Sequence, residues 1–231
     1  LSGMSGHGAS SFYYPPQAVN NCQQCHMPLM ASNDFGARFS ESVGSRVVHD
    51  HLFPAANTAL PQLLHLSPAV LKTQQDFLHN GVLRADIFAV HEDGRIDGEL
   101  HAPLRPEVPT LQPGKTYLLD VVVRTLRIGH AFTQGTADSN EVWVEVTATS
   151  GGRTLGRSGA VNAESAVDPW AHFLNVYMVD REGRRIDRRN VQDIFVPLYD
   201  HQIPPGAADV IHYRLQLPDD VREAVTVEVK V

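Results

Sequence analysis

The two cysteines of this chain lie in the run Asn21-Cys22-Gln23-Gln24-Cys25-His26. This C-x-x-C-H spacing allows two thiols to form thioether bonds with both vinyl groups of one porphyrin, and the adjoining imidazole can then bind the iron. The spacing therefore predicts a covalently bound haem c, held through Cys22 and Cys25, with His26 as one axial iron ligand.

Three other kinds of site compete for the same two thiols. A redox-active dithiol needs a preceding strand and a helix that begins at the first cysteine, and the residues before Asn21 do not have the pattern of a strand. A structural zinc site needs four ligands, and the pair His49 and His51 could supply the other two. A disulfide across two intervening residues would be strained. Only haem attachment requires a histidine directly after Cys25, so haem is the favoured interpretation.

A six-coordinate iron needs a second ligand from the opposite face of the porphyrin. His49 and His51 are the candidates downstream, and in an extended segment they point to opposite sides, so only one of them can bind this iron. Asp50 could orient an imidazole by accepting its Nδ1-H. Ligation by two histidines leaves no vacant position for a substrate and favours ferric iron, which predicts a low-potential electron carrier over an enzyme.

Composition restricts the class of protein and of partner. The chain has 231 residues, 42% of them hydrophobic, twelve histidines and a net charge of -7. An acidic chain disfavours nucleic acid and anionic membrane surfaces as partners. It contains no apolar run of roughly 20 residues, the length that crosses a bilayer. Its first residues lack the features of a signal peptide, so we expect a soluble chain that begins after a cleavage point or inside a longer polypeptide.

The pattern of apolar residues divides the chain in two. Residues 1–82 are mostly irregular, with one short helix that begins at Ser67-Pro68 and ends at Asn80-Gly81. Residues 83–231 alternate with a period of two between turn signals. Examples are a hairpin that pairs Ile87–Val90 with Ile96–Leu100 through a type I′ turn at Asp93-Gly94, and the alternating valines of 142–146 and 225–231. We therefore predict a mainly β protein: an immunoglobulin-like antiparallel β-sandwich that follows a small haem-binding segment.

Three segments resemble the multihaem c-type cytochromes related to the cytochrome c554 and doubled-CXXCH groups. Residues 22–28 (CQQCHMP) resemble the last haem motif of these proteins. Residues 51–61 (HLFPAANTALP) are similar to their H-x-F-x-x-A-N-T-A-L-P segment, and residues 129–141 (GHAFTQGTADSNE) are similar to G-H-x-F-P-x-G-T-x-D-S-x-E. Thr133 stands where the pattern has proline, and this chain has one C-x-x-C-H where such proteins have several.

The resemblance implies that His51, and not His49, is the distal iron ligand. It also implies that His130 could bind a haem on another part of the protein or on a partner chain. His201, before a strand, could face another haem, although a hydrogen bond within its loop is the favoured interpretation. The arginines between residues 181 and 189 could pair with propionates or with a partner's carboxylates, and solvated charge is again favoured.

The sequence as a whole predicts an exported electron-transfer subunit in the periplasm or outside the cell. Its expected partners are other haem-bearing domains or cytochrome subunits, and it could also form oligomers. Two alternatives stay open: a haem-dependent reductase of a small nitrogen or sulfur compound, and an assembly or adhesion module in which the sandwich is primary and the haem structural.

Overall fold

The computed structural model describes residues 22–56, 58–134 and 137–231. Residues 1–21, Asn57 of the second motif segment, and Gly135 and Thr136 of the third lie outside the described residues. The chain forms two compact units. The first contains the described residues up to Leu83 together with Leu126–Ala131 and Pro204–Gly206, and the second contains Arg84–Thr125, Phe132–Ile203 and Ala207–Val231. The first unit is therefore assembled from three separate parts of the sequence.

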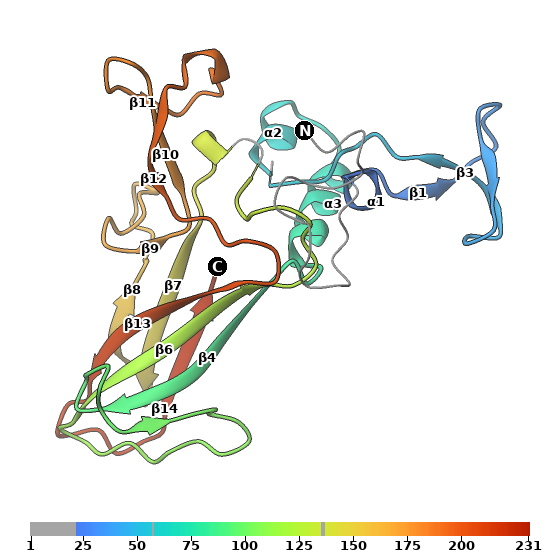
Figure 1. Ribbon diagram of the computed structural model, residues 1–231. Helices are drawn as coiled ribbons and strands as arrows, with labels where there is room; N and C mark the ends of the chain where they lie inside the picture. The colour runs from blue at the N-terminus through green and yellow to red at the C-terminus, as the bar shows by residue number, and fades with distance from the viewer. Residues whose placement is uncertain (1–21, 57, 135–136) are drawn as a thin grey trace. The chain divides into compact units, whose positions relative to one another are not determined.

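The first unit combines short helices with a small sheet (Figure 1). Its helices are α1 (Cys22–His26), α2 (Ala59–Leu63) and α3 (Pro68–His79). Its sheet has the order β1-β3-β2, with antiparallel pairs between β1 (Leu29–Ala31), β3 (Ser45–His49) and β2 (Arg38–Ser40). The sequence predicted only α3 among these elements, because the others are too short to show a clear period in the apolar pattern.

Helix α3 confirms the one helix predicted from the sequence. Pro68 is its first residue and Ser67, with extended φ and ψ, is the N-cap. Proline suits this position because the first N-H groups of a helix have no acceptor within it. The helix ends at His79 with Asn80 as its C-cap, and Gly81 follows with a φ of +68°, the left-handed conformation that glycine adopts without steric cost.

Two four-stranded sheets form the body of the second unit. One has the order β13-β6-β4-β5, and the other has the order β14-β7-β8, with β9 also paired to β7. The strands of the first are β13 (Ala208–Gln216), β6 (Thr116–Thr125), β4 (Leu83–Glu92) and β5 (Leu100–His101); those of the second are β14 (Val225–Lys230), β7 (Trp143–Ser150), β8 (Arg153–Ser158) and β9 (His172–Phe173). The pairs β13–β6, β14–β7 and β7–β8 are antiparallel.

The hydrophobic core lies between these two sheets. Tyr117 and Leu119 of β6 and Leu215 of β13 pack with Ala148 of β7, and Val225 of β14 is packed against the cluster. Alternate residues of β6 and β7 are buried, as expected for strands that turn one face to a partner sheet. The predicted mainly β fold with a sandwich of antiparallel sheets is confirmed.

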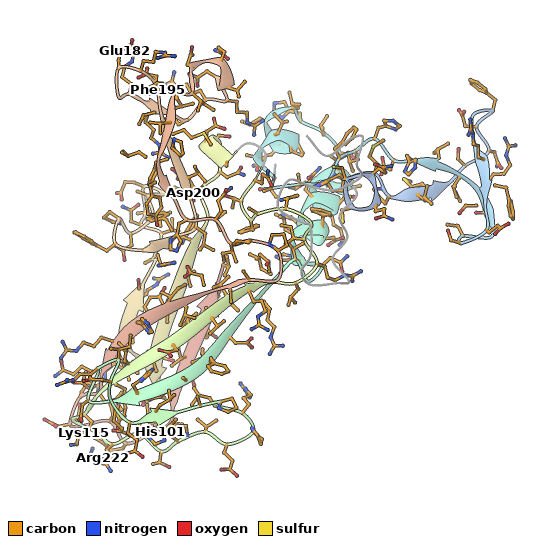
Figure 2. All side chains as sticks on the ribbon, viewed as in Figure 1. His101, Lys115, Glu182, Phe195, Asp200 and Arg222 are labelled. Carbon is orange, nitrogen blue, oxygen red and sulfur yellow. The ribbon has the colours of Figure 1, made fainter. Side chains whose placement is uncertain are left out.

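A third sheet of the second unit has the order β11-β10-β12. Its strands are β10 (Val176–Val179), β11 (Arg185–Ile186) and β12 (Val196–Asp200), and two short 3-10 helices, η1 (Ala137–Ser139) and η2 (Val191–Asp193), lie in the same unit. Figure 2 shows Glu182 and Phe195 near the tip of this sheet, whereas His101, Lys115 and Arg222 lie at the opposite end of the sandwich.

The hairpin after β4 differs from the expected one in the length of its second strand. Asp93 and Gly94 both have positive φ, at +59° and +62°, as the predicted type I′ turn requires. A second turn follows, in which the N-H of Gly98 bonds to the carbonyl of Arg95. Pairing therefore resumes only at Leu100, and Ile96 is exposed instead of lying in a strand.

No helix in the described residues is long and apolar enough to cross a membrane.

Candidate haem site

Helix α1 presents the two cysteines on one face. Cys22 and Cys25 are three residues apart, a spacing that places two side chains on the same side of a helix. Cys22 is exposed, Cys25 is half-buried, and neither forms a disulfide. Two thiols on one face, with His26 next to the second, are the arrangement that a thioether-linked porphyrin requires.

The His26 imidazole is oriented by a backbone carbonyl. Its Nδ1 lies 2.8 Å from the carbonyl oxygen of Pro54. A carbonyl oxygen can only accept, so Nδ1 carries the proton and donates it. In the neutral ring, Nε2 then has a lone pair available for a metal. Hydrogen bonds of this kind fix the orientation of metal-binding histidines and make the ligand atom more basic.

Helix α3 contributes one residue that contacts His26 and another that bonds to the neighbouring backbone. Gln74, which is buried, accepts a hydrogen bond from the backbone N-H of Ala55 through its Oε1, at 2.6 Å. Phe77, one turn later on the same side of α3, packs against the His26 ring with 5.3 Å between ring centroids. The helix therefore positions both the imidazole and the peptide segment to which it is bonded.

A cavity of about 410 Å³ opens beside the motif. It is lined by Cys22, Gln23, His26, Met27, Phe53 and Ala55. Its volume lies within the range of roughly 300–1,000 Å³ that is usual for ligand and cofactor sites. The cavity therefore has a thiol and an imidazole that could bind a cofactor, and apolar walls formed by Met27 and Phe53.

Few large apolar side chains are buried in the first unit. Among its described residues, the buried hydrophobic ones are Ala37, Val47, Ile128 and Ala131. Many larger ones are exposed: Leu29, Met30, Phe35, Phe39, Val43, Phe53, Leu60, Leu63, Leu64 and Leu66. The described part of this unit therefore has a small core, and a large apolar cofactor is one way to add buried apolar surface to it.

His51 and His49 are both exposed, and each has its Nδ1 near a backbone carbonyl oxygen. The distances are 2.9 Å from His51 to the oxygen of His49 and 2.7 Å from His49 to that of Met27. Both rings therefore keep Nε2 for a ligand. His51 meets Phe53 edge to face, with 5.8 Å between ring centroids. The predicted distal ligand thus contacts a residue of the cavity wall.

His130 is the histidine whose ring lies near that of His26 and almost parallel to it. The two ring centroids are 6.3 Å apart and the ring planes differ by 12°. The Nδ1 of His130 lies 2.8 Å from the carbonyl oxygen of Ala131. Burial lowers the pKa of His130, and the nearby His26 lowers it further, although the bond to Ala131 opposes both. The sequence alone did not assign His130 to this site, and the motif that contains Gly129 and His130 was the only indication that this histidine could bind haem.

The alternative sites for the cysteines receive no support from the described residues. Burial, and to a smaller extent Cys22, raises the pKa of the Cys25 thiol despite the opposing charge of Arg127. Reactive dithiols have the opposite property. In the described part of the chain, the one group of three metal-ligating side chains is His172, His201 and Asp209. A zinc-type set of ligands around Cys22 and Cys25 is therefore not assembled there.

His201 belongs to a hydrogen-bonded cluster in the second unit. Its Nε2 lies 3.1 Å from Oδ2 of Asp209, and Nε2 of His172 lies 2.7 Å from the same oxygen. Its Nδ1 is 2.7 Å from the hydroxyl of Tyr199. These distances are those of direct hydrogen bonds, so the side chains of the cluster bond to one another.

The arginines near residues 181–189 are largely matched by local acceptors. Arg184 bonds to Asp180 and Glu182, and Arg185 reaches Glu141 at 3.5 Å. The backbone N-H of Arg189 donates to the buried carboxylate of Asp138 at 2.8 Å. The acidic 138–141 segment therefore takes part in contacts with this basic stretch.

Comparisons with known proteins give one distant structural similarity. No family model matches the sequence, and no curated protein matches it. The fold is similar to a crystal structure of a penta-heme cytochrome c552 from Thermochromatium tepidum, with 18% sequence identity and a TM-score of 0.47. The similarity covers 90% of this chain, which spans 38% of that protein.

Proposed function

We propose that this chain is an electron-transfer protein that binds haem c covalently through Cys22 and Cys25, with His26 as an axial ligand. The main support for the proposal is the hydrogen bond that orients His26 beside the cavity. Its Nδ1-H donates to the carbonyl of Pro54, so Nε2 is available beside the space that Cys22 also lines. These features support the haem interpretation of the C-x-x-C-H run.

The bound cofactor would supply an iron centre that gains and loses one electron. The protein's own residues would do the rest. The two thiols fix the macrocycle, the Pro54 carbonyl orients His26 and increases its basicity, and Met27 and Phe53 limit the access of water. Greater ligand basicity stabilises the ferric state, which lowers the reduction potential.

The cofactor would also give the first unit a hydrophobic core. Its described residues bury only four hydrophobic side chains, and none is larger than isoleucine. A porphyrin bound beside α1 and α3 would bring apolar surface into a unit that otherwise has little. In this proposal the cofactor contributes to folding as well as to redox chemistry.

Location and partners follow from the chemistry of haem c. Because this cofactor is attached after export, we propose that the chain works in the periplasm or outside the cell. Its partners would be other haem-bearing domains or cytochrome subunits, since electrons move between centres. The net charge of -7 favours a basic or neutral docking surface.

A pyridine haemochrome spectrum tests the proposal directly. The chain is produced in a host with a haem c maturation system, denatured and extracted with acidified acetone. We expect a c-type haem band that stays with the polypeptide, and loss of that band in the double variant Cys22→Ser/Cys25→Ser. The matched control His172→Asn changes a histidine of the second unit and should keep the band. A wild-type chain without covalent haem would rule the proposal out.

A further inference from the structure

We propose that His130 is the second axial ligand of the iron that His26 binds, an inference that rests on the proposed haem c function. The two rings would then hold one iron between them, one on each face of the porphyrin. The sequence did not indicate that these two histidines lie together, because they are far apart along the chain.

The distance between the two rings matches this arrangement. A metal–imidazole bond is about 2 Å long and the ring centroid lies about 1 Å beyond the nitrogen, so two imidazoles on opposite sides of one ion have centroids about 6 Å apart. The centroids of His26 and His130 are 6.3 Å apart. The observed separation of the centroids is therefore the one expected for two imidazoles that bind one metal ion from opposite sides.

The two rings also carry the same hydrogen-bond pattern. The Nδ1 of His26 lies 2.8 Å from the carbonyl oxygen of Pro54, and the Nδ1 of His130 lies 2.8 Å from that of Ala131. Each carbonyl acts as the acceptor, which assigns the proton to Nδ1 in both rings and a lone pair to Nε2. Backbone carbonyls play this orienting role at histidines that bind metals.

The segment that carries His130 is fixed within the first unit. Leu126–Ala131 belongs to this unit, and the N-H of Leu126 donates to the carbonyl of Val82 at 2.9 Å. Ile128 and Ala131, on either side of His130, are buried. Both residues anchor the loop, so the imidazole is presented by an ordered segment and does not have to be recruited from solvent.

His51 shares the hydrogen bond from Nδ1 to a backbone carbonyl but differs from His130 in its exposure and in its ring contacts. It is exposed, its ring contact is the edge-to-face one with Phe53, and the ring contacts of His26 among the described residues are with Phe77 and His130. The expectation that His51 is the distal ligand stays a prediction of the resemblance. The two histidines can therefore be compared in one experiment.

The experiment uses the full-length holoprotein and replaces each histidine by methionine. We expect His130→Met to convert the iron to His/Met ligation, with a new iron–sulfur charge-transfer band in the ferric near-infrared spectrum and a higher reduction potential. The matched variant His51→Met should keep the wild-type spectrum and potential. The opposite result, a change with His51→Met and none with His130→Met, would overturn the assignment.

A second variant covers the case in which methionine at position 130 prevents folding. His130→Gly opens a space that free imidazole can enter. We expect a high-spin ferric spectrum without imidazole and a return to the wild-type low-spin spectrum when imidazole is added. A low-spin spectrum in His130→Gly without imidazole would contradict the proposal.

The angle between the rings gives a third measurement. Ring planes 12° apart predict the rhombic low-spin EPR signal of near-parallel imidazoles, and not the signal with one large g value that perpendicular rings give. Failure of this inference is distinct from failure of the proposed function. If the wild-type protein carries covalent haem but the variants at position 130 keep its spectrum, only the assignment of His130 as a ligand is refuted. If the wild-type protein carries no covalent haem, both the assignment and the proposed function are refuted.

Discussion

Gln74 accepts a hydrogen bond from the backbone N-H of Ala55, which belongs to the same peptide group as the Pro54 carbonyl that orients His26. Because Gln74 is 4% exposed, the bond is shielded from water. The Pro54 carbonyl is thus held indirectly by α3, and Gln74 is a positioning residue for the candidate iron ligand.

Replacement of Gln74 by leucine should therefore affect both stability and the haem. The Ala55 N-H would lose its acceptor, at a cost of about 1–3 kcal/mol in the free energy of unfolding. A weaker bond to His26 would also make its Nε2 less basic and raise the reduction potential. Gln74→Glu, which keeps an acceptor, should restore the potential, and the exposed neighbour change Gln75→Leu should alter neither property. Urea denaturation and potentiometric titration measure the two effects, and a destabilised Gln74→Leu with an unchanged potential would limit Gln74 to a structural role.

The stability of the first unit should depend on the cofactor far more than that of the second unit does. In the haem-free Cys22→Ser/Cys25→Ser variant, we expect fast amide hydrogen exchange in α1 and α3, since little apolar surface is buried around them. Strands β6, β7 and β13 should stay protected because the sandwich has its own core. Hydrogen exchange followed by mass spectrometry resolves the two regions. Equal protection of α3 with and without haem would contradict the prediction.

Asp209 should stabilise the second unit through two histidines at once. Its Oδ2 accepts from His172 and from His201, so Asp209→Ala leaves two imidazole N-H groups without this acceptor. We expect a loss of about 1–2 kcal/mol in the free energy of unfolding, because the site is partly hydrated and water can replace part of the interaction. Asp187→Ala, at a more exposed carboxylate 3.7 Å from Arg188, is the matched control and should have little effect. Similar losses in both variants would argue against a special role of the cluster.

Tyr213 should make the second unit sensitive to alkaline pH. Burial, and then the negative charge of Asp209, raises the pKa of Tyr213 from 10.0 to about 12, and its buried hydroxyl has no hydrogen-bond partner among the described residues. An unfolded tyrosine loses its proton near pH 10, about two units earlier, so stability is complete below that pH and falls as the pH rises toward 12.

The variant Tyr213→Phe isolates this contribution. It removes the hydroxyl but keeps the ring, so we expect unchanged or slightly greater stability at neutral pH and a smaller decline between about pH 10 and 12. Urea denaturation across that range gives the comparison with wild type. Parallel declines in the two proteins would show that other groups cause the alkaline loss.

The sequence was informative where a local pattern repeats. Alternating valines predicted β7 and β14, and Ser67-Pro68 with Asn80-Gly81 predicted the ends of α3. The sheet β1-β3-β2 was not predicted, because three-residue strands carry too little periodicity. Contacts between residues far apart in the sequence were missed for a different reason. The spacing of residues along the chain does not indicate which loop contacts which helix. The neighbouring, nearly parallel rings of His26 and His130 are the main example.

The three-part make-up of the first unit has a consequence for how the protein matures. Its last segment, Pro204–Gly206, is synthesised long after the cysteine motif. A chain that emerges from a ribosome or a translocon therefore displays Cys22 and Cys25 while the unit is still incomplete. If Cys22 and Cys25 bind haem as proposed, their thiols would be accessible to a maturation enzyme during this interval, because the unit is complete only after Pro204–Gly206 has emerged.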